Sequence, residues 1–400
     1  MTQPRARHIS DLLQVHLEEL EFLWGRRRTA LASRELTARD YTELNERIEA
    51  HIQGMLAVPA ALPGLLLPRL IESERDAVFA AACPLLRLAD HTTSAVVKAF
   101  ATAEDAALAG IRDALSVAPI GLATAAVQNQ FEKADSPHAV AAAVVLANQR
   151  LLNPAAPRLN TLLLESEPAV AELAWLAATI ADVRDPSFLP QRPFRHALEQ
   201  EAPKVRGAAL RAAAWTGQEW TLPVVRDFAA RADQAALVWL AALGMPEDFA
   251  AFSQLVLQLP SAEQRCVLLA RFGHPGAFDL VVSWLEEEDV LAAAAGEAFT
   301  RITGADIRGH RKTLDVAADA DEFAREFAPD VWLPDAAKAR AYLKRYGSII
   351  AGGARWRAGV DVGGECTPEA LARVDLEARW DLCARAALAG KPSAAPPPVH

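Results

Sequence analysis

Cysteine is scarce in this chain of 400 residues. Its four copies, Cys83, Cys266, Cys366 and Cys383, form no CxxC pair. A disulfide framework or a structural zinc site would need cysteines at set, closer spacings. We therefore expect buried free thiols.

Sequence motifs that are typical of catalytic sites are missing as well. The nine histidines form no HExxH pattern or cluster, and neither GxxxxGK[ST] nor GxSxG occurs. The nearest approach to a ligand pair is His16 with Glu19, three residues apart, which also fits a histidine at the edge of an apolar stripe. Carboxylate pairs of the glycosidase kind stay open, because their separation in space is invisible in sequence. We expect no catalytic residue, no cofactor and no metal.

Positive charge is in deficit, with 41 basic against 51 acidic side chains and a net charge of −10. Such a field repels phosphate backbones and anionic lipid, so we expect neither nucleic acid nor membrane as a partner. The N-terminal residues contain no apolar signal core, which predicts a cytoplasmic protein. Residues 114–131 are uncharged but include Pro119 and Gly121, and we expect no membrane span there.

Four glycines, by contrast, occur at regular intervals. Gly217, Gly244, Gly273 and Gly304 each close an alanine- and leucine-rich phrase, at intervals of about 30 residues. A period of this length is typical of helical hairpins that bury their apolar faces by stacking on their neighbours. The composition favours helix over sheet, and we predict an all-α fold with helical repeats over residues 75–304.

The flanking regions read differently from the repeats. Apolar residues follow steps of three and four in the first helix, at Ile9, Leu12, Leu13, Leu17, Leu20, Leu23 and Trp24. Thr37 and Asp40 match a capping box that opens a second helix, so residues 1–58 should form a helical hairpin. A Pro-rich join (59–74), a helical capping region (305–389) and a disordered tail (390–400) complete the predicted organisation.

Several phrases carry a resemblance. Residues 203–215 resemble the second helix of a HEAT-type repeat. Residues 16–24 with 46–51, 296–304 and 355–359 together resemble an uncharacterised family of bacterial HEAT-like repeat proteins, whose genes tend to lie beside those of type VI secretion components. This resemblance implies a HEAT-like solenoid and an accessory role in secretion, as a chaperone, loading protein or neutralising protein for an effector. It supplies no catalytic residue.

Candidate partner-binding residues follow from the expected architecture. In a HEAT-type array the second helices line the inner surface, and tryptophan and arginine dominate binding hot spots. The candidates on these helices are Trp215, Trp239, Arg211, Arg271 and Arg301. Each tryptophan also fits a space-filling role between helices. Arg26, Arg27 and Arg28 form a basic cluster that fits either partner docking or stabilisation of a helix C-terminus.

The sequence thus predicts a non-catalytic protein–protein interaction module. One alternative is a HEAT-like enzyme, either a DNA glycosylase or a chromophore lyase, and the glycosylase would need a basic inner groove built from arginines such as Arg206 and Arg211. A third possibility is a structural scaffold for a cytoplasmic assembly.

Overall fold

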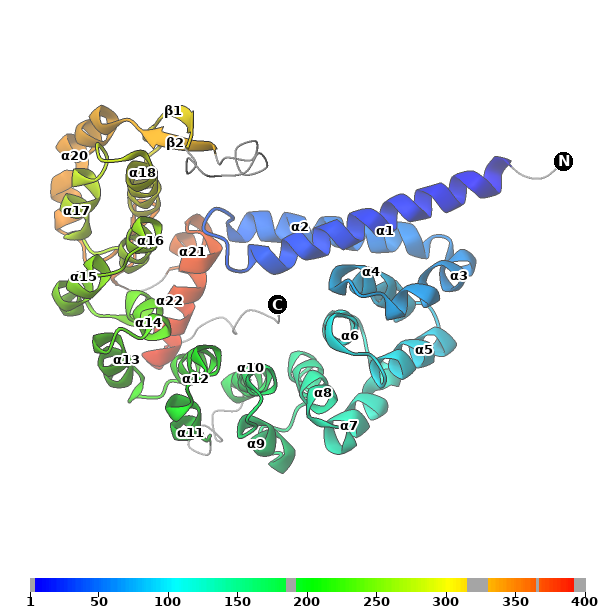
Figure 1. Ribbon diagram of the computed structural model, residues 1–400. Helices are drawn as coiled ribbons and strands as arrows, with labels where there is room; N and C mark the ends of the chain where they lie inside the picture. Colours follow the sequence, from blue (N-terminus) through cyan, green and yellow to red (C-terminus); the bar gives the residue numbers. More distant parts are fainter. Residues whose placement is uncertain (1–3, 185–191, 315–329, 365–366, 392–400) are drawn as a thin grey trace, which may run out of the picture. The chain divides into compact units, whose positions relative to one another are not determined.

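The computed structural model describes residues 4–184, 192–314, 330–364 and 367–391. These residues are mostly helical, which confirms the predicted all-α class (Figure 1). The chain divides into two compact units, one made of Met1–Gln218 with Ala387–His400 and the other of Glu219–Ala386. The division falls inside the region predicted to hold the repeats.

The first unit begins with the predicted helical hairpin. Helices α1 (Pro4–Ala30) and α2 (Ala38–Leu56) pack against each other, and α1 also packs on α4 (Arg75–Leu85). The capping box is present: Thr37 accepts from the backbone N–H of Asp40, whose carboxylate accepts from the backbone N–H of Thr37. The buried sides of the two helices are lined by Leu13, Leu17, Leu20, Leu23, Trp24, Ile48, Ile52 and Met55.

The Pro-rich join is itself helical. Prolines at the first turns of short helices cost nothing, because those backbone N–H groups would lack helical partners anyway. The join contains η1 (Pro59–Ala61), α3 (Leu62–Leu66) and η2 (Leu67–Ile71).

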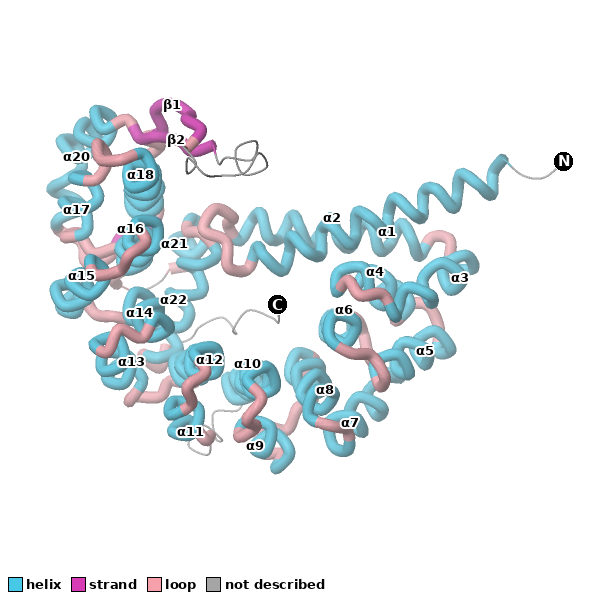
Figure 2. Tube along the Cα trace, viewed as in Figure 1, coloured by secondary structure: helices cyan, strands magenta, loops and turns pink. Residues whose placement is uncertain are grey.

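The rest of the first unit consists of helices in two rows. One row stacks α4, α6 (Asp105–Val117), α8 (Ser136–Asn148), α10 (Pro168–Arg184) and α12 (Pro203–Trp215), each on the next. The other holds α5 (Asp90–Phe100), α7 (Thr124–Lys133), α9 (Pro157–Leu163) and α11 (Phe194–Glu199), with η3 (Gly121–Ala123) before α7. Each helix of the second row packs on the first-row helix that follows it, as the tube view also shows (Figure 2). Alanines fill much of the first row, which permits close approach of the helices.

The second unit has the same alternation. Helices α14 (Gln234–Leu243), α16 (Ala262–Phe272) and α18 (Asp289–Thr303) stack in a row. The companions are α13 (Thr221–Ala230), α15 (Phe249–Leu257) and α17 (Ala277–Ser283), with η5 (Pro246–Asp248) before α15.

Three of the four rhythmic glycines terminate helices in the left-handed conformation. Gly217, Gly273 and Gly304 have φ of 68°, 69° and 71°, where a side chain would be strained. Gly244 follows α14 at φ −54° and needs no such freedom. Glycine therefore follows all four helices, but Gly244 is required for a different reason. A Cβ at Gly244 would lie 2.5 Å from the carbonyl oxygen of Leu240.

The region after Gly304 is less purely helical than predicted. Strands β1 (Arg308–Thr313) and β2 (Asp330–Pro334) form an antiparallel ribbon, and β3 (Trp356–Arg357) with β4 (Val360–Asp361) form a second, shorter one. The helices are α20 (Ala336–Ala351), α21 (Pro368–Arg373) and α22 (Leu376–Leu388). The predicted helical capping region (305–389) therefore contains two short ribbons in addition to these helices. Residues 392–400 of the predicted tail lie outside the described residues.

Candidate interaction surfaces

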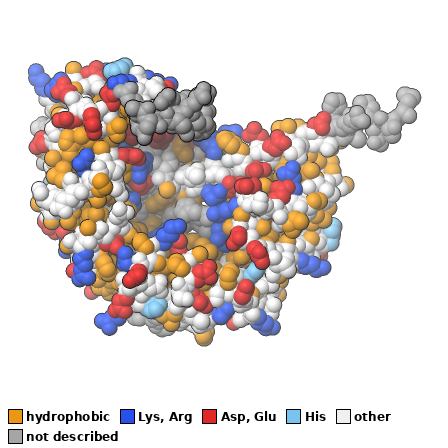
Figure 3. Space-filling view, viewed as in Figure 1, with side chains coloured by type: hydrophobic (Ala, Val, Ile, Leu, Met, Phe, Trp, Pro, Cys, Tyr) orange, Lys and Arg blue, Asp and Glu red, His pale blue; other side chains and the backbone are white. Residues whose placement is uncertain are grey.

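One face of α1 carries large apolar side chains that nothing in the described chain covers. Leu12, Val15 and Phe22 are 58%, 52% and 58% exposed, and Ile9 is 42% exposed. Their spacing places Leu12, Val15 and Phe22 on one side of the helix, opposite the buried Leu17 and Trp24. The expectation that Ile9 and Leu12 belong to the buried stripe is wrong. Space-filling shows apolar and acidic side chains mixed along the hairpin (Figure 3).

The three predicted arginines at the end of α1 have three different environments. Arg27 is buried between the rings of Trp24 and Tyr41, at 4.6 and 5.2 Å, and its Nε donates to Asn45 at 2.7 Å. Burial lowers the pKa of Arg27 below its ordinary value. Arg28 makes a two-pronged ion pair with Asp76, at 2.8 Å for both bonds. These two residues therefore join α1 to its neighbours and are not available to a partner.

Arg26 alone of the three remains exposed, with its guanidinium 5.9 Å from the ring centroid of Phe22. It therefore continues the exposed apolar face of α1. We call Leu12, Val15, Phe22 and Arg26 the α1 face.

A buried charge network that sequence reasoning missed fixes α1, α4 and α6 together. The carboxylate of Asp113 accepts from Arg75 at 2.8 Å, from Arg112 at 3.0 Å and from the indole of Trp24 at 3.3 Å. Only the two adjacent charges at 112 and 113 inside an apolar phrase could have signalled it. A buried carboxylate needs such partners to offset its lost hydration.

The candidate residues on α12 and α14 differ in how far they are buried. Trp215 is 4% exposed and belongs to the core, which corrects its assignment as a partner-binding residue. Trp239 and Arg211 are half-buried. Burial lowers the pKa of Arg211 to about 10, although the carboxylate of Glu172 on α10 opposes this shift.

Arg271 and Arg301 are already occupied by acidic side chains of the C-terminal helices. Arg271 donates to both oxygens of Asp381, at 2.9 and 2.7 Å, and Arg301 donates to Glu377 at 2.6 Å. Arg301 also lies 3.7 Å from Asp375. The prediction that these arginines await a partner is therefore wrong for the folded chain.

In this cluster, burial and the neighbouring opposite charges shift the pKa values in opposite directions. Burial raises the pKa of Glu377, but the guanidiniums of Arg271 and Arg301 outweigh it and bring the pKa down to about 2. Burial would lower the pKa of Arg271, yet Asp381 and Glu377 hold it above its ordinary value. The pairs are thus charged at neutral pH.

The segment Arg355 to Gly359 forms hydrogen bonds to the C-terminal ends of α14, α16 and α18. The guanidinium of Arg355, 2% exposed, donates to the carbonyls of Phe272 and Gly244 at 2.7 Å each, and to those of Ala242 and Arg271 at 3.2 Å. It also donates to the carbonyl of Ala241. One cation therefore caps the C-termini of both α14 and α16, where the helix dipoles are negative.

The backbone of this segment completes these contacts. Trp356 donates to the carbonyl of Gly273 at 2.7 Å, and Ala358 donates to that of Arg301 at 2.7 Å. Arg357 reaches the carbonyl of Arg271. Residues 355–359 thus bind the C-terminal ends of three helices, α14, α16 and α18, together.

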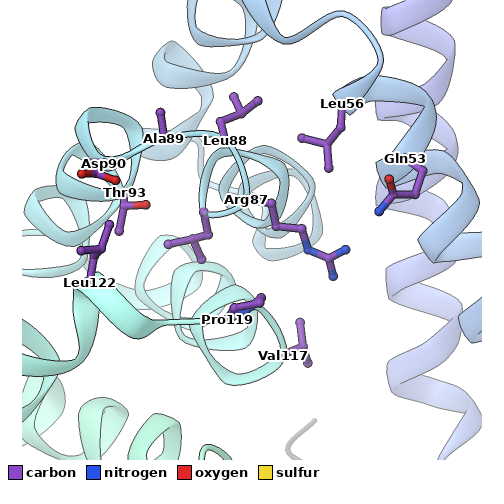
Figure 4. Close-up of a pocket in the computed structure, with 11 residues that line it drawn as sticks. Gln53, Leu56, Arg87, Leu88, Ala89, Asp90, Thr93, Val117, Pro119 and Leu122 are labelled. Atoms are coloured by element: carbon purple, nitrogen blue, oxygen red, sulfur yellow. The ribbon is translucent and has the colours of Figure 1, made fainter.

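An open hollow of about 660 Å³ lies in the first unit, between the end of α2, the α4–α5 turn and the end of α6 (Figure 4). Its lining combines aliphatic and polar side chains, namely Gln53, Leu56, Leu86, Arg87, Leu88, Ala89, Asp90, Thr93, Val117, Pro119 and Leu122. The guanidinium of Arg87 is paired with Glu49 at 2.8 Å. The hollow thus offers aliphatic contact beside one neutralised cation.

Titratable groups elsewhere form few clusters. His16 Nδ1 lies 3.1 Å from His51 Nδ1, so the histidine that the sequence placed beside Glu19 faces a second histidine instead. Within the described residues, no group of three or more His, Cys, Asp or Glu side chains could hold a metal ion. Cys83 and Cys266 are free and buried as expected, Cys383 is also buried, and burial raises the pKa of the Cys83 thiol to about 11. Cys366 lies outside the described residues.

Among the described residues, no single helix is long and apolar enough to cross a membrane, and one bent pair, Ala38–Leu56 with Pro59–Ile71, passes that test only by length and composition. A scan against protein-family models finds no match to the chain, and a search of curated proteins finds no significant relative.

Proposed function

We propose that this protein is a non-catalytic protein–protein interaction module, built as a HEAT-like helical-repeat solenoid with an N-terminal helical hairpin and a C-terminal cap. Two features support the architecture. Alternate helices stack in a row within each unit, and four glycines about 30 residues apart follow the ends of helices, three of them in the left-handed conformation. An array of this kind offers extended surfaces for gripping another protein.

The observation that carries the proposal is the α1 face. Full burial of a leucine, valine or phenylalanine side chain contributes roughly 1.5–3 kcal/mol, so three such side chains left half-exposed on one helix face forgo a large stabilisation. Exposed apolar residues beside charged ones are characteristic of interaction sites. Positions 12, 15, 19, 22 and 26 have the spacing of a coiled-coil seam, with Glu19 at its middle position.

The charges around the α1 face define the occupant. Asp11 and Glu18 lie exposed along one edge, seven residues apart, while Arg26 lies at the C-terminal end. The complementary ligand is a partner protein's amphipathic helix with apolar residues at heptad spacing and basic residues beside them. Opposite charges at these flanking positions set partner choice and orientation.

The class of partner is proposed from the resemblance of residues 16–24, 296–304 and 355–359. We place the protein beside type VI secretion in the bacterial cytoplasm, where it would chaperone, load or neutralise an effector or its adaptor. The α1 face then holds a basic helical segment of that client.

The test begins with tagged full-length protein purified from the native organism under mild conditions. A co-purifying protein is then produced separately and titrated against wild type and against Phe22→Asp by calorimetry. We expect the variant to lose binding by about 100-fold, since a charge at the centre of an apolar interface costs several kcal/mol. Its thermal transition should not move, because Phe22 is exposed.

The matched control is Ile71→Asp in η2, because Ile71 is 85% exposed and lies off α1. It should bind like wild type. A peptide comprising the partner's basic amphipathic helix should compete with the whole partner. Equal loss of binding in both variants, a partner that lacks such a helix, or self-association of the chain through Phe22 would each refute the proposal.

A further inference from the structure

Positive charge is segregated in the second unit. β1 (Arg308–Thr313) and α20 (Ala336–Ala351) contain Arg308, Arg311, Lys312, Lys338, Arg340, Lys344 and Arg345. Neither element contains an aspartate or glutamate, in a chain whose net charge is −10. A concentration of one sign against the overall charge indicates a local function for these side chains.

An exposed tryptophan lies within this region. Trp332 on β2 pairs with Arg311 across the ribbon and is 44% exposed. The guanidiniums of Arg308 and Arg311 lie 5.6 and 5.8 Å from the centroid of its ring. A register shift between Arg308 and Arg311 allows both residues to reach the same indole. Tryptophan and arginine are both enriched among the hot-spot residues of protein interfaces.

The cluster is anchored and partly neutralised from one side. Asp306 holds Arg308 through two bonds of 2.9 Å, Asp330 lies 3.8 Å from Arg311, and Asp289 pairs with Lys312. These contacts orient the cations, so that their side chains lose less conformational entropy when a ligand binds.

Further along, on α20, the described residues compensate the positive charge only at Arg340. Arg340 pairs with Glu286 at 3.0 Å, with both side chains more than half exposed. Lys344 and Arg345 are exposed and have no acidic partner among the described residues. Lys338 donates to the backbone carbonyl of Arg308 at 2.8 Å, which ties α20 to the ribbon. The ribbon and α20 therefore form one basic surface.

We propose that this surface, Trp332 with Arg308, Arg311, Lys338, Lys344 and Arg345, is a docking site for an acidic segment of a protein partner. The site goes beyond the α1 face and does not depend on it. The guanidinium of Arg345 can form bidentate bonds to a carboxylate of the bound segment, Arg308 and Arg311 remain oriented by Asp306 and Asp330, and the exposed part of the Trp332 indole contributes apolar contact. The uncompensated charges of α20 extend the attraction along the bound segment.

Two other polyanions fit less well. Single-stranded nucleic acid is held by stacking bases on aromatic rings, but here two guanidiniums already lie over the Trp332 ring. A bilayer requires an exposed apolar helix face beside the basic one. In α20, Ala339 and Ile350 are buried, and Ile349 is the only large aliphatic side chain of this helix that is exposed. An extended polyanion would also experience the negative field of the whole chain.

The test uses the full chain and a fluorescently labelled peptide of alternating glutamate and serine, with a glutamine–serine peptide as the neutral control. Wild type should bind the acidic peptide with an affinity that falls as salt increases, and should not bind the neutral one. The double variant Arg311→Glu/Lys344→Glu should weaken binding by about tenfold or more. Trp332→Ala should weaken it at unchanged net charge.

The matched control is Arg39→Glu/Arg231→Glu, which changes net charge by the same amount at two arginines of 86% and 68% side-chain exposure outside the surface. It should retain wild-type affinity. Circular dichroism verifies that every variant is folded, and Lys344→Glu alone serves if the ribbon variant is not.

Three results would overturn the proposal. The first is no binding of the acidic peptide by wild type. The second is an equal loss of affinity in the control pair, which would make the effect one of total charge. The third is tighter binding of oligothymidylate or of phosphatidylserine vesicles, lost in the same double variant, which would assign the surface to nucleic acid or to membrane.

Discussion

Replacing Arg355 by methionine tests whether one buried cation holds the helix ends of the second unit. Its guanidinium donates to carbonyls at the C-termini of α14 and α16 and lies 4.6 Å from the ring of Phe272. Methionine preserves much of the volume and the apolar contact but supplies no donor. The carbonyls of Gly244 and Phe272, bonded at 2.7 Å each, would lose their guanidinium partner.

The expected cost follows from these losses. A buried polar group left without a partner costs about 1–3 kcal/mol, and two such carbonyls give about 2–6 kcal/mol. Loss of a cation at helix C-termini adds up to about 2 kcal/mol. Removing a buried charge recovers part of this, because desolvation disfavours the guanidinium and lowers its pKa. We expect a net loss of about 3–5 kcal/mol, as when one partner of a buried ion pair is removed.

Urea unfolding followed by circular dichroism measures the change, and hydrogen–deuterium exchange locates it. Faster exchange should appear in the last turns of α14 and α16 before it appears elsewhere. Arg355→Lys should fall between wild type and methionine, since an ammonium keeps the charge but not the planar fork. Arg373→Met is the control, because Arg373 is exposed in the same unit. A change below about 0.5 kcal/mol for Arg355→Met, the range of surface substitutions, would refute the reasoning.

Two further predictions concern glycine and histidine. Gly273→Ala places a Cβ at φ +69° and 2.4 Å from the carbonyl oxygen of Trp356, so the free energy of unfolding should fall by more than about 1–2 kcal/mol, whereas Gly347→Ala, with no atom within 4 Å, should not destabilise. Thermal melts of both variants check this, and equal melting temperatures would contradict it. Burial and the neighbouring His16 lower the pKa of His51 below 6.5, so the unfolded chain takes up the proton more readily. The free energy of unfolding should therefore be highest above pH 6.5 and should decrease as the pH falls below it. His51→Gln should reduce the dependence of the melting temperature on pH below 6.5. An unchanged dependence would contradict a role for the His16–His51 pair.

Much of the local structure can be read from the residues themselves. Thr37 and Asp40 form the predicted capping box, and Gly273 and Gly304 end their helices in the left-handed conformation that glycine favours. The hairpin of α1 and α2 follows from apolar residues at steps of three and four. These features depend on neighbours within about one helical turn, which is why sequence spacing suffices to predict them.

The candidate site was harder to predict, because exposure is a property of the assembled chain. Leu12 continues an apolar stripe in sequence yet faces solvent, since α2 and α4 cover only the opposite side of α1. Trp332 and the basic strand beside it lie in the region that the sequence predicted to be a helical cap. The two-stranded ribbon was likewise not foreseen, because strand pairing depends on partners separated in the chain.

The sequence by itself determined that the chain is helical and where many of its helices start and stop. Tertiary structure alone decided which charges are free. Arg271 and Arg301 read as exposed hot-spot residues until Asp381 and Glu377, more than 70 positions away, neutralise them. Arg26 and Arg27 are adjacent, yet one is exposed and the other is held between two rings. The physical reason is that a cation's availability depends on desolvation and on the carboxylates that long-range packing brings within bonding distance, and neither is encoded in local spacing.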